Sequence, residues 1–250
     1  MTSLPTENEP AAHKIADIKA LIQAFNNELH TRAKSGETVE TLLKARSDFI
    51  DQLLTNYWNE ILGPYSNQLA LIATGGYGRA ELHPFSDIDL LIIFDESELD
   101  NYKTELESFS TFLWDIGLKP GRSVRTISDC LEQSKLDITV ITNLMEARLI
   151  TGSEAFFSDM QDQISIDNLW SPVAFFREKV AEQHNRHLKF GNTAYNLEPD
   201  MKEGPGGLRD IQTIQWITQR YFGSNSLGEL VNHAFLTKNE YRSLVKGQRF

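Results

Sequence analysis

The sequence predicts an α+β protein with a small sheet, flanking helices and a helical domain after the sheet. Two observations lead to this class. Residues 69–73 and 87–94 are short, largely apolar runs, which are typical of strands buried on both faces. Elsewhere the apolar residues recur at helical spacing, and after residue 126 this spacing is the dominant pattern.

Each element of the first half follows from a local pattern. Residues 1–12 are polar and are expected to form a disordered leader. Gly63-Pro64 and Gly117 are helix stop signals. In chain order we predict helices over 15–29 and 42–61, a strand at 69–73, a glycine turn with a short helix from Gly78, a strand over 87–94, a helix over 102–116 and a strand over 122–126.

The second half is predicted to be helical. Ser171-Pro172 is a strong start signal, with the serine as N-cap and the proline at the first helical position. The domains are expected to be 1–40, a leader and helix; 41–150, with the sheet; and 151–250, helical and continuing past Phe250 in the natural protein. The helices are predicted at 127–135, 138–150, 154–163, 172–189, 207–222 and 238–246.

Composition narrows the function. Among 250 residues, 24 Lys and Arg stand against 35 Asp and Glu, a net charge of −11, which argues against binding of nucleic acid. Cys130 is the single cysteine, so the chain has neither a disulfide framework nor a thiolate zinc cluster. The sequence has no secretory signal and no apolar run long enough to span a membrane. We therefore expect a cytoplasmic protein without a membrane partner.

The most informative residues lie between the two apolar runs and at the start of the second run. Glycine at Gly75 and Gly76 allows positive φ and close approach of a ligand. A helix beginning near Gly78 would point its free N–H groups at this turn, which suits a phosphate. Asp87 and Asp89 are two residues apart on a strand, so their carboxylates share a face. Mg²⁺ takes such carboxylates together with the phosphates of a nucleotide.

Each part alone has a plain structural interpretation, as a turn or as a solvated strand end. The combination is more specific, because two charges at the mouth of an apolar strand are costly unless a cation pairs them. A dinucleotide-binding fold does not fit, since the spacing is G-G-x-G and an acidic pair follows after about ten residues. A Walker A loop is also excluded, because no Gly-Lys-Ser/Thr is present here.

The segment GGYGRAELHPFSDID, Gly75 to Asp89, resembles the nucleotidyltransferase superfamily that includes DNA polymerase beta. Within it, the segment is similar to the PII uridylyltransferase/uridylyl-removing enzymes of bacterial nitrogen control. A second block, Asn196 to Asp210, contains KEGPGGLRD and is similar to the same family and its near relatives. WDIGLKPGRSVRT at 114–126 and LMEARLITG at 144–152 are weaker matches.

The resemblance implies a small mixed sheet and makes 41–150 the nucleotidyltransferase domain. It implies transfer of UMP from UTP to a tyrosine of the PII signal protein, with release of pyrophosphate. Asp87 and Asp89 would be catalytic and would hold Mg²⁺, and Gly75 and Gly76 would bind the UTP phosphates. Arg79 would contact a phosphate or pair with acids, and Ser86 would orient Asp87, contact a phosphate or cap the strand entry.

Other points stay open at this stage. Many superfamily members carry a third carboxylate, which here is Asp137, Glu146 or absent. Lys202 and Arg209 would meet the triphosphate or the incoming protein, or Arg209 would pair with Asp210 in a structural turn. The resemblance implies that uridylyl removal depends on a hydrolase domain marked by a His-Asp pair. This chain has no such pair, so no uridylyl-removing activity is expected. The alternatives are adenylyl transfer to a protein or small molecule and a non-catalytic nucleotide-binding module.

Overall fold

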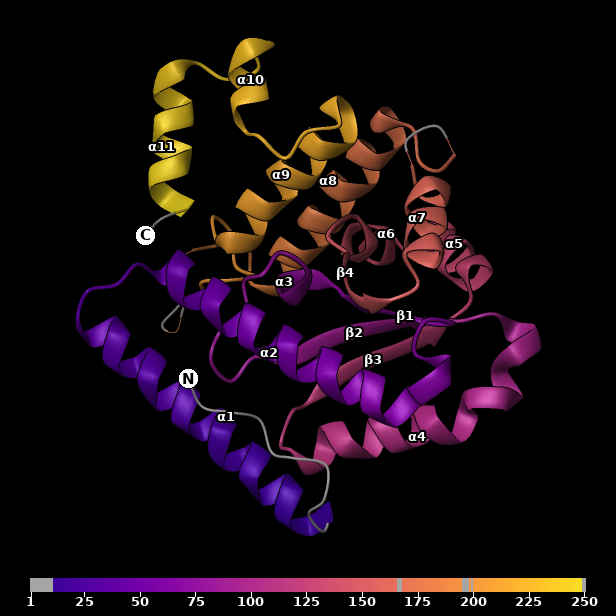
Figure 1. Cartoon of the computed structure of the whole chain (residues 1–250). Coiled ribbons are helices and arrows are strands. Elements are labelled where there is room, and N and C mark those ends of the chain that lie inside the picture. The colour runs from indigo at the N-terminus through magenta and orange to yellow at the C-terminus, as the bar shows by residue number, and fades with distance from the viewer. Residues whose placement is uncertain (1–10, 166–167, 195–197, 199, 249–250) are drawn as a thin grey trace. The chain divides into compact units, whose positions relative to one another are not determined.

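The computed structural model describes residues 11–165, 168–194, 198 and 200–248 (Figure 1). The expected leader lies mostly outside the described residues, and its last two positions, 11 and 12, are helical.

The chain folds into two compact units. The first comprises Met1–Gln133 and Glu146–Asp162, and the second comprises Ser134–Met145 and Gln163–Phe250. The chain thus leaves the first unit after Gln133 and returns to it at Glu146. The predicted domain limits at residues 40 and 150 stay a prediction.

The first unit contains the sheet and the helices around it. Helix α2 starts at the N-cap Thr38, whose side chain accepts a hydrogen bond from the Thr41 backbone N–H, and it stops at Gly63, which has a φ of 51°. The elements are α1 (Ala11–Lys34), α2 (Val39–Leu62), β1 (Ala70–Ala73), α3 (Gly75–Gly78), β2 (Ile88–Ile93), α4 (Leu99–Asp115), β3 (Pro120–Arg125), most of α5 (Ile127–Leu136), β4 (Arg148–Gly152) and most of α7 (Glu154–Gln163).

Among the described residues, four strands form one sheet in the order β3-β2-β1-β4. Strand β1 pairs antiparallel with both β2 and β4, whereas β2 and β3 are parallel. The sheet is therefore mixed, and the predicted α+β class is confirmed. The last residues of β1 lie beside the first residues of β2, because these two strands are antiparallel.

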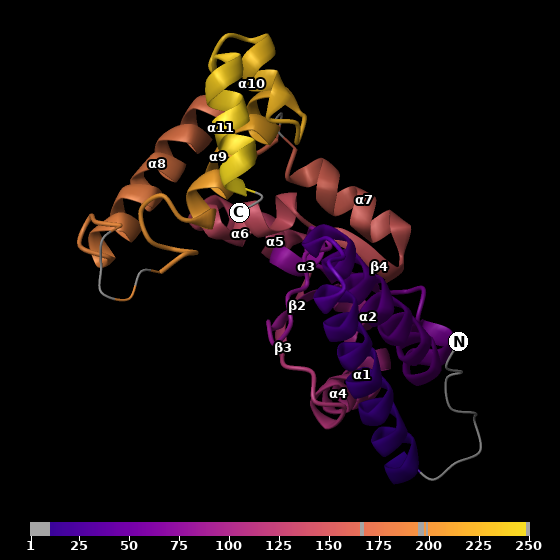
Figure 2. The same ribbon diagram turned by 90° about the vertical axis from the view of Figure 1, so that its left-hand side faces the viewer.

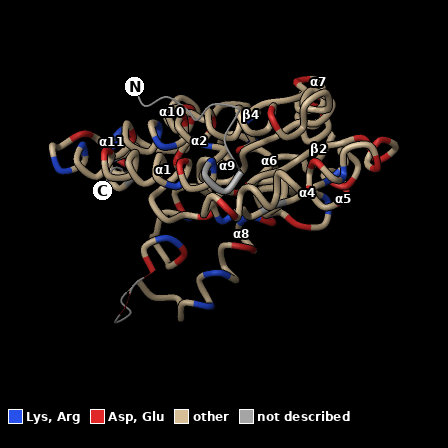
Figure 3. The backbone as a smooth tube through the Cα atoms, turned by 60° about the horizontal axis from the view of Figure 1, so that its bottom comes forward, with Lys and Arg blue, Asp and Glu red and all other residues tan. Residues whose placement is uncertain are grey.

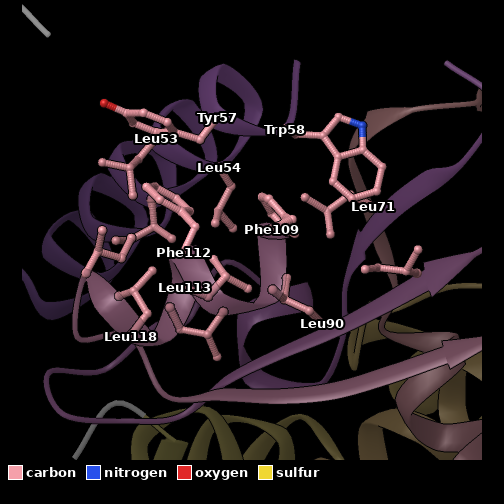
Figure 4. Close-up of a cluster of buried hydrophobic side chains, with 14 of the residues drawn as sticks. Leu53, Leu54, Tyr57, Trp58, Leu71, Leu90, Phe109, Phe112, Leu113 and Leu118 are labelled. Carbon is pink, nitrogen blue, oxygen red and sulfur yellow. The ribbon is translucent and has the colours of Figure 1, made fainter. Parts of the chain in front are cut away.

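Helices α2 and α4 cover one face of this sheet, as the two perpendicular views show (Figures 1 and 2). Leu71, Leu90 and Ile92 point into the core on this face. Figure 4 shows how side chains of α2 and α4 meet over the sheet. Trp58 and Phe109 pack edge to face with centroids 5.1 Å apart, and the Trp58 indole N–H donates to the Ser66 carbonyl over 2.9 Å. The buried indole thus has a partner for its polar atom.

The second unit is helical in its described part. As predicted, Ser171 caps α8, since its hydroxyl accepts a hydrogen bond from the Ala174 N–H. Buried Arg220 donates to the carbonyls of Ile164, Ser165 and Trp170, which ties α9 to the segment before α8. The helices are α6 (Ile138–Met145), α8 (Pro172–Lys189), α9 (Leu208–Phe222), α10 (Gly228–Asn232) and α11 (Lys238–Gln248).

Two elements correct the sequence-based prediction. The helix expected over 138–150 ends at Met145, and residues 148–152 form strand β4. The sequence of β4, RLITG, contains neither a long apolar run nor a strict alternation of apolar and polar residues, which are the patterns that mark a strand. Every residue of β4 is half-buried. The helix expected from Gly78 onward is instead the single turn α3, which ends at Gly78.

Charged residues of both signs are distributed along the chain (Figure 3). Figure 3 shows Lys and Arg interspersed with Asp and Glu along the helices. Within the described residues, no helix combines the length and the apolar character needed to cross a bilayer.

The core predicts a measurable difference between two leucines. Leu113 on α4 is 1% exposed and Leu136 is 80% exposed. We expect Leu113→Ala to lower the free energy of unfolding by about 2–5 kcal/mol, because it removes buried methyl groups and leaves a cavity. Leu136→Ala should change it by less than about 0.5 kcal/mol. Urea denaturation followed by circular dichroism measures both, and equal effects would contradict this core.

Candidate active site

The candidate site lies where the end of β1 meets the start of β2. Ala73 is opposite Leu90, and the next residue along, Thr74, donates its backbone N–H to the Asp89 carbonyl over 3.0 Å. Gly75 follows directly and Asp87 lies one residue before β2. The glycine turn and the two aspartates, which sequence analysis singled out together, are therefore brought side by side by the pairing of two buried strands.

Asp87 and Asp89 are both exposed, whereas Ile88 between them is buried in the core. Because side chains alternate along a strand, Asp89 lies on the face opposite to the core under α2 and α4. Leu90, its neighbour in the chain, is buried on the core side. The two carboxylates are thus presented at the strand end, away from the apolar packing that fixes the strand.

Asp89 has a glycine on each side. A Cβ placed on Gly75 would lie 3.2 Å from Oδ2 of Asp89, and one placed on Gly121 would lie 2.4 Å from Oδ1. Gly121 is the residue of β3 that pairs with Asp89. The residue of β3 directly beside Asp89 therefore supplies no carboxylate.

The glycines of the turn have different roles. Gly75 has a φ of 57°, a left-handed conformation that favours glycine. Gly76 has room for a Cβ, whose nearest neighbours would be the Glu81 carbonyl oxygen at 3.6 Å and Arg79 Nη2 at 3.7 Å. At Gly78, in contrast, a Cβ would lie 2.1 Å from the Glu146 carbonyl oxygen. Gly78 is thus required for packing, while Gly76 leaves space open.

Two segments far apart in the sequence, α2 and β4, hold this turn. The Tyr77 hydroxyl donates to Oδ1 of Asp51 on α2 over 2.6 Å. Arg148 on β4 donates to Oδ2 of Asp51 over 2.6 Å and to Oδ1 over 3.2 Å. The Arg148 guanidinium also donates to the carbonyls of Gly78 and Tyr77. Burial and the Asp51 charge both raise the pKa of Tyr77, so its hydroxyl stays a donor.

Sequence reasoning missed Asp51 and Arg148. Asp51 lies on a long amphipathic helix, where a single charge is normally solvent-facing. Arg148 lies 97 residues further along, in the strand that was taken for a helix. No local pattern links the two positions.

Arg79 is engaged by acids. Its Nε donates to Glu81 and its Nη1 to Glu146, each over 2.7 Å. Burial alone would lower the pKa of Arg79, but the charges of Glu146 and Glu81 outweigh it and raise this pKa. These two ion pairs agree with the interpretation that Arg79 pairs with acidic residues. They also give Glu146, one of the two candidates for a third carboxylate, a structural partner.

Two further predicted residues have local roles. The Ser86 hydroxyl donates to the His83 carbonyl over 2.9 Å and so closes the turn before Asp87. Asp137, the other candidate for a third carboxylate, accepts hydrogen bonds from the backbone and side chain of Thr139 at the start of α6. Asp137 lies in the second unit. Within the described residues no group of three or more His, Cys, Asp and Glu side chains is arranged to hold a metal.

The second predicted block, Asn196 to Asp210, lies in the second unit and forms a loop held by hydrogen bonds. Its residues Asn196, Leu197 and Pro199 lie outside the described residues. Asp210 in the first turn of α9 is the centre of this loop. Its carboxylate accepts hydrogen bonds from Gln183 and Arg186 of α8 and from the Gly206 backbone, and His187 Nε2 lies 3.0 Å from it.

The two cationic side chains of this loop, Arg209 and Lys202, differ in their surroundings. Arg209 pairs with Glu203 rather than with Asp210, and its guanidinium lies 5.3 Å from the centre of the Trp216 ring. Lys202 is exposed. The structural interpretation of the loop is thus supported by a pairing of Asp210 with α8 that sequence reasoning did not identify.

Part of the chain is similar to a known class of protein domain. Residues 56–128, which run from the end of α2 to the start of α5, match the model of the nucleotidyltransferase domain. This range includes the glycine turn and both aspartates. The fold of the first unit and this match define a nucleotidyltransferase domain.

Two further similarities are more specific. Residues 174–250 match the GlnD PII-uridylyltransferase model. The chain is 47% identical over 240 residues to the bifunctional uridylyltransferase/uridylyl-removing enzyme of Methylococcus capsulatus, covering 96% of this chain and 27% of that protein. The enzymes of the same name from Pseudomonas entomophila and Azotobacter vinelandii are 45% and 44% identical over 96% and 93% of the chain, and 27% and 26% of their own length is covered.

The resemblance inferred from the motifs is therefore confirmed: the chain is similar to PII uridylyltransferases over nearly its whole length and contains a nucleotidyltransferase domain. It spans about a quarter of the length of these relatives.

The Asp210 cluster predicts a pH dependence of stability. Burial raises the pKa of Asp210, but the hydrogen bonds from Gln183, Arg186, Gly206 and His187 outweigh it and hold the pKa at about 2. A carboxylate with a depressed pKa adds stability that is complete above its unfolded pKa of about 4 and is lost as the pH falls through about 2.

We expect Asp210→Asn to be less stable than the wild type by about 2 kcal/mol at pH 7. The gap should close as the pH falls from about 4 to about 2. Urea midpoints of both proteins across this range measure it. A gap that is constant with pH would contradict the role given to Asp210.

Proposed function

We propose that this chain transfers UMP from UTP to a tyrosine hydroxyl of the PII signal protein and releases pyrophosphate. The observation that carries the proposal is the pair Asp87 and Asp89, exposed on one strand end beside a left-handed glycine turn. Relatives that match almost the whole chain are named uridylyltransferases, which supports this choice of reaction.

The residues at the strand end fit a divalent metal ion. Oxygen ligands from two exposed carboxylates are the kind that Mg²⁺ takes, and nucleotide phosphates complete its coordination. Asp87 and Asp89 would hold the ion. When bound, Mg²⁺ neutralises charge on the phosphates and on the oxygen that leaves.

The glycine turn would bind the phosphates of UTP. The first N–H groups of a helical turn lack intrahelical acceptors, and Gly75 and Gly76 begin such a turn. The absence of a side chain at Gly76 lets a phosphate come close to the backbone. Arg79 would act mainly through the turn, since Glu81 and Glu146 already bind its guanidinium. Ser86 would fix the loop that presents Asp87.

The reaction would consist of attack by the tyrosine oxygen on the α-phosphorus, with cleavage of the bond to the β-phosphate. Phosphoryl and nucleotidyl transfers depend mainly on positioning and charge stabilisation. Two carboxylates are therefore enough for the proposed site. Gly121 occupies the place opposite Asp89, and Glu146 is bound to Arg79.

The direct test is incubation of the full chain with purified PII, Mg²⁺ and labelled UTP, with labelled ATP and an excess of unlabelled nucleotide in competition. We expect labelled UTP to label PII. An excess of unlabelled UTP should abolish this labelling, whereas an excess of unlabelled ATP should not. Equal labelling from ATP would favour adenylyl transfer. Nucleotide binding without labelling of any acceptor would favour the non-catalytic module.

Asp89 is predicted to be essential for transfer. Asp89→Asn removes a charged metal ligand, so we expect transfer to fall by several orders of magnitude in a folded protein. Asp100→Asn, an exposed residue of α4, is the matched control and should keep wild-type activity. Initial rates with PII and UTP, after a circular dichroism check of folding, measure both. Wild-type turnover by folded Asp89→Asn would refute the assignment.

Gly76 is predicted to serve the nucleotide and Gly78 the fold. Gly76→Ala fits the free protein, so its melting temperature should stay near the wild-type value while the affinity for Mg²⁺–UTP weakens. Gly78→Ala places its methyl group against the Glu146 carbonyl and should lower the melting temperature markedly. Calorimetric titration and thermal melts separate the two effects. Unchanged affinity of Gly76→Ala would return this residue to a simple turn role.

A further inference from the structure

Gly121 lies in the interior of β3, where glycine is unfavourable because it adds backbone entropy to the unfolded chain and has no side chain to pack. Its φ is not in the left-handed region. A residue with a Cβ could therefore adopt the same backbone conformation. The reason for glycine at this position is spatial rather than conformational.

The space is taken by the Asp89 carboxylate. Strands β2 and β3 are parallel, and Asp89 and Gly121 are direct partners in the register. A Cβ on Gly121 would be 2.4 Å from Oδ1 and 3.6 Å from Cγ of Asp89. The first distance is far inside the roughly 3.5 Å at which non-bonded atoms attract. Any larger residue at 121 would force the carboxylate to move.

The second oxygen of Asp89 is limited from the other side. A Cβ on Gly75 would be 3.2 Å from Oδ2. The Asp89 carboxylate thus lies in a slot between Gly75 of α3 and Gly121 of β3, with one oxygen toward each. We call this arrangement the two-glycine slot.

We infer that Gly121 is a positioning residue of the transferase site: by leaving the slot open, it sets the direction in which Asp89 presents its oxygens to a divalent cation. This inference rests on the proposed function for the identity of the cation. Its steric part concerns only this chain and is open to test without turnover.

The first measurement is metal binding. Calorimetric titration of Mn²⁺ as a probe, with a non-hydrolysable UTP analogue present, should show at least tenfold weaker binding to Gly121→Ala. Ser123→Ala is the matched control, since Ser123 faces the same side of β3 two residues on and pairs with Leu91. It should bind Mn²⁺ like the wild type. Unchanged Mn²⁺ affinity of folded Gly121→Ala overturns the inference.

The second measurement is a stability cycle. Gly121→Ala should lower the melting temperature in the wild type more than in the Asp89→Ala background, where the obstructing carboxylate is gone. In that background the change should be neutral or stabilising, because alanine restricts the unfolded chain. If Gly121→Ala fails to fold while the double variant folds, the slot is supported. If neither folds, the requirement does not come from Asp89 and the inference fails.

The two proposals fail in different ways. Absence of transfer to PII by the wild type, with Mn²⁺ binding and the coupling between Gly121 and Asp89 intact, would refute the reaction and leave the slot standing. If the wild type binds no Mn²⁺, the inference fails, even where the stability cycle shows the steric coupling between Gly121 and Asp89. The slot alone would be refuted by a third result. In that result the wild type transfers UMP to PII, Gly121→Ala changes the melting temperature equally in both backgrounds, and Gly121→Ala binds Mn²⁺ like the wild type.

Discussion

The ion pair between Asp51 and Arg148, with the Tyr77 hydroxyl as its third member, holds the glycine turn in place. The turn α3 is four residues long and three of these are glycine, so it has little helical preference of its own. Its conformation is imposed by α2 and β4, which hold it from either side through hydrogen bonds to charged groups, each worth about 1.5–3 kcal/mol. The placement of Gly75 beside the Asp89 carboxylate therefore depends on contacts between segments far apart in the chain.

The parts of the fold that local patterns encode were predicted from the sequence. The apolar runs at β1 and β2 and the capped helix α8 stand where expected. Asp87 and Asp89 could be proposed as site residues because a period of two and a neighbouring glycine turn are visible in a short stretch of sequence. The family was recognised because whole blocks of residues matched, which the comparisons then confirmed.

The remaining parts depend on tertiary contacts. Strand β4 is half-buried, and its residues continue the helical spacing of α6, so period alone favoured a helix. The role of Gly121 arises only when β3 is set in register beside Asp89. Arg79 had two open interpretations in the sequence, and its pairing with Glu146, which is 67 residues away, could not be predicted from the local pattern. Sequence patterns of this kind carry no register and no long-range pairing.

The path of the chain through its two units has a consequence for biosynthesis. The supports of the glycine turn, Glu146 and Arg148, belong to the first unit but are made after residues 134–145 of the second. A ribosome that has released β1, α3, β2 and β3 has therefore not yet supplied the last strand of the sheet. A nascent chain halted before residue 146 would expose the open edge of β1, which is a template for wrong pairing. The site becomes complete in one late step, when β4 docks.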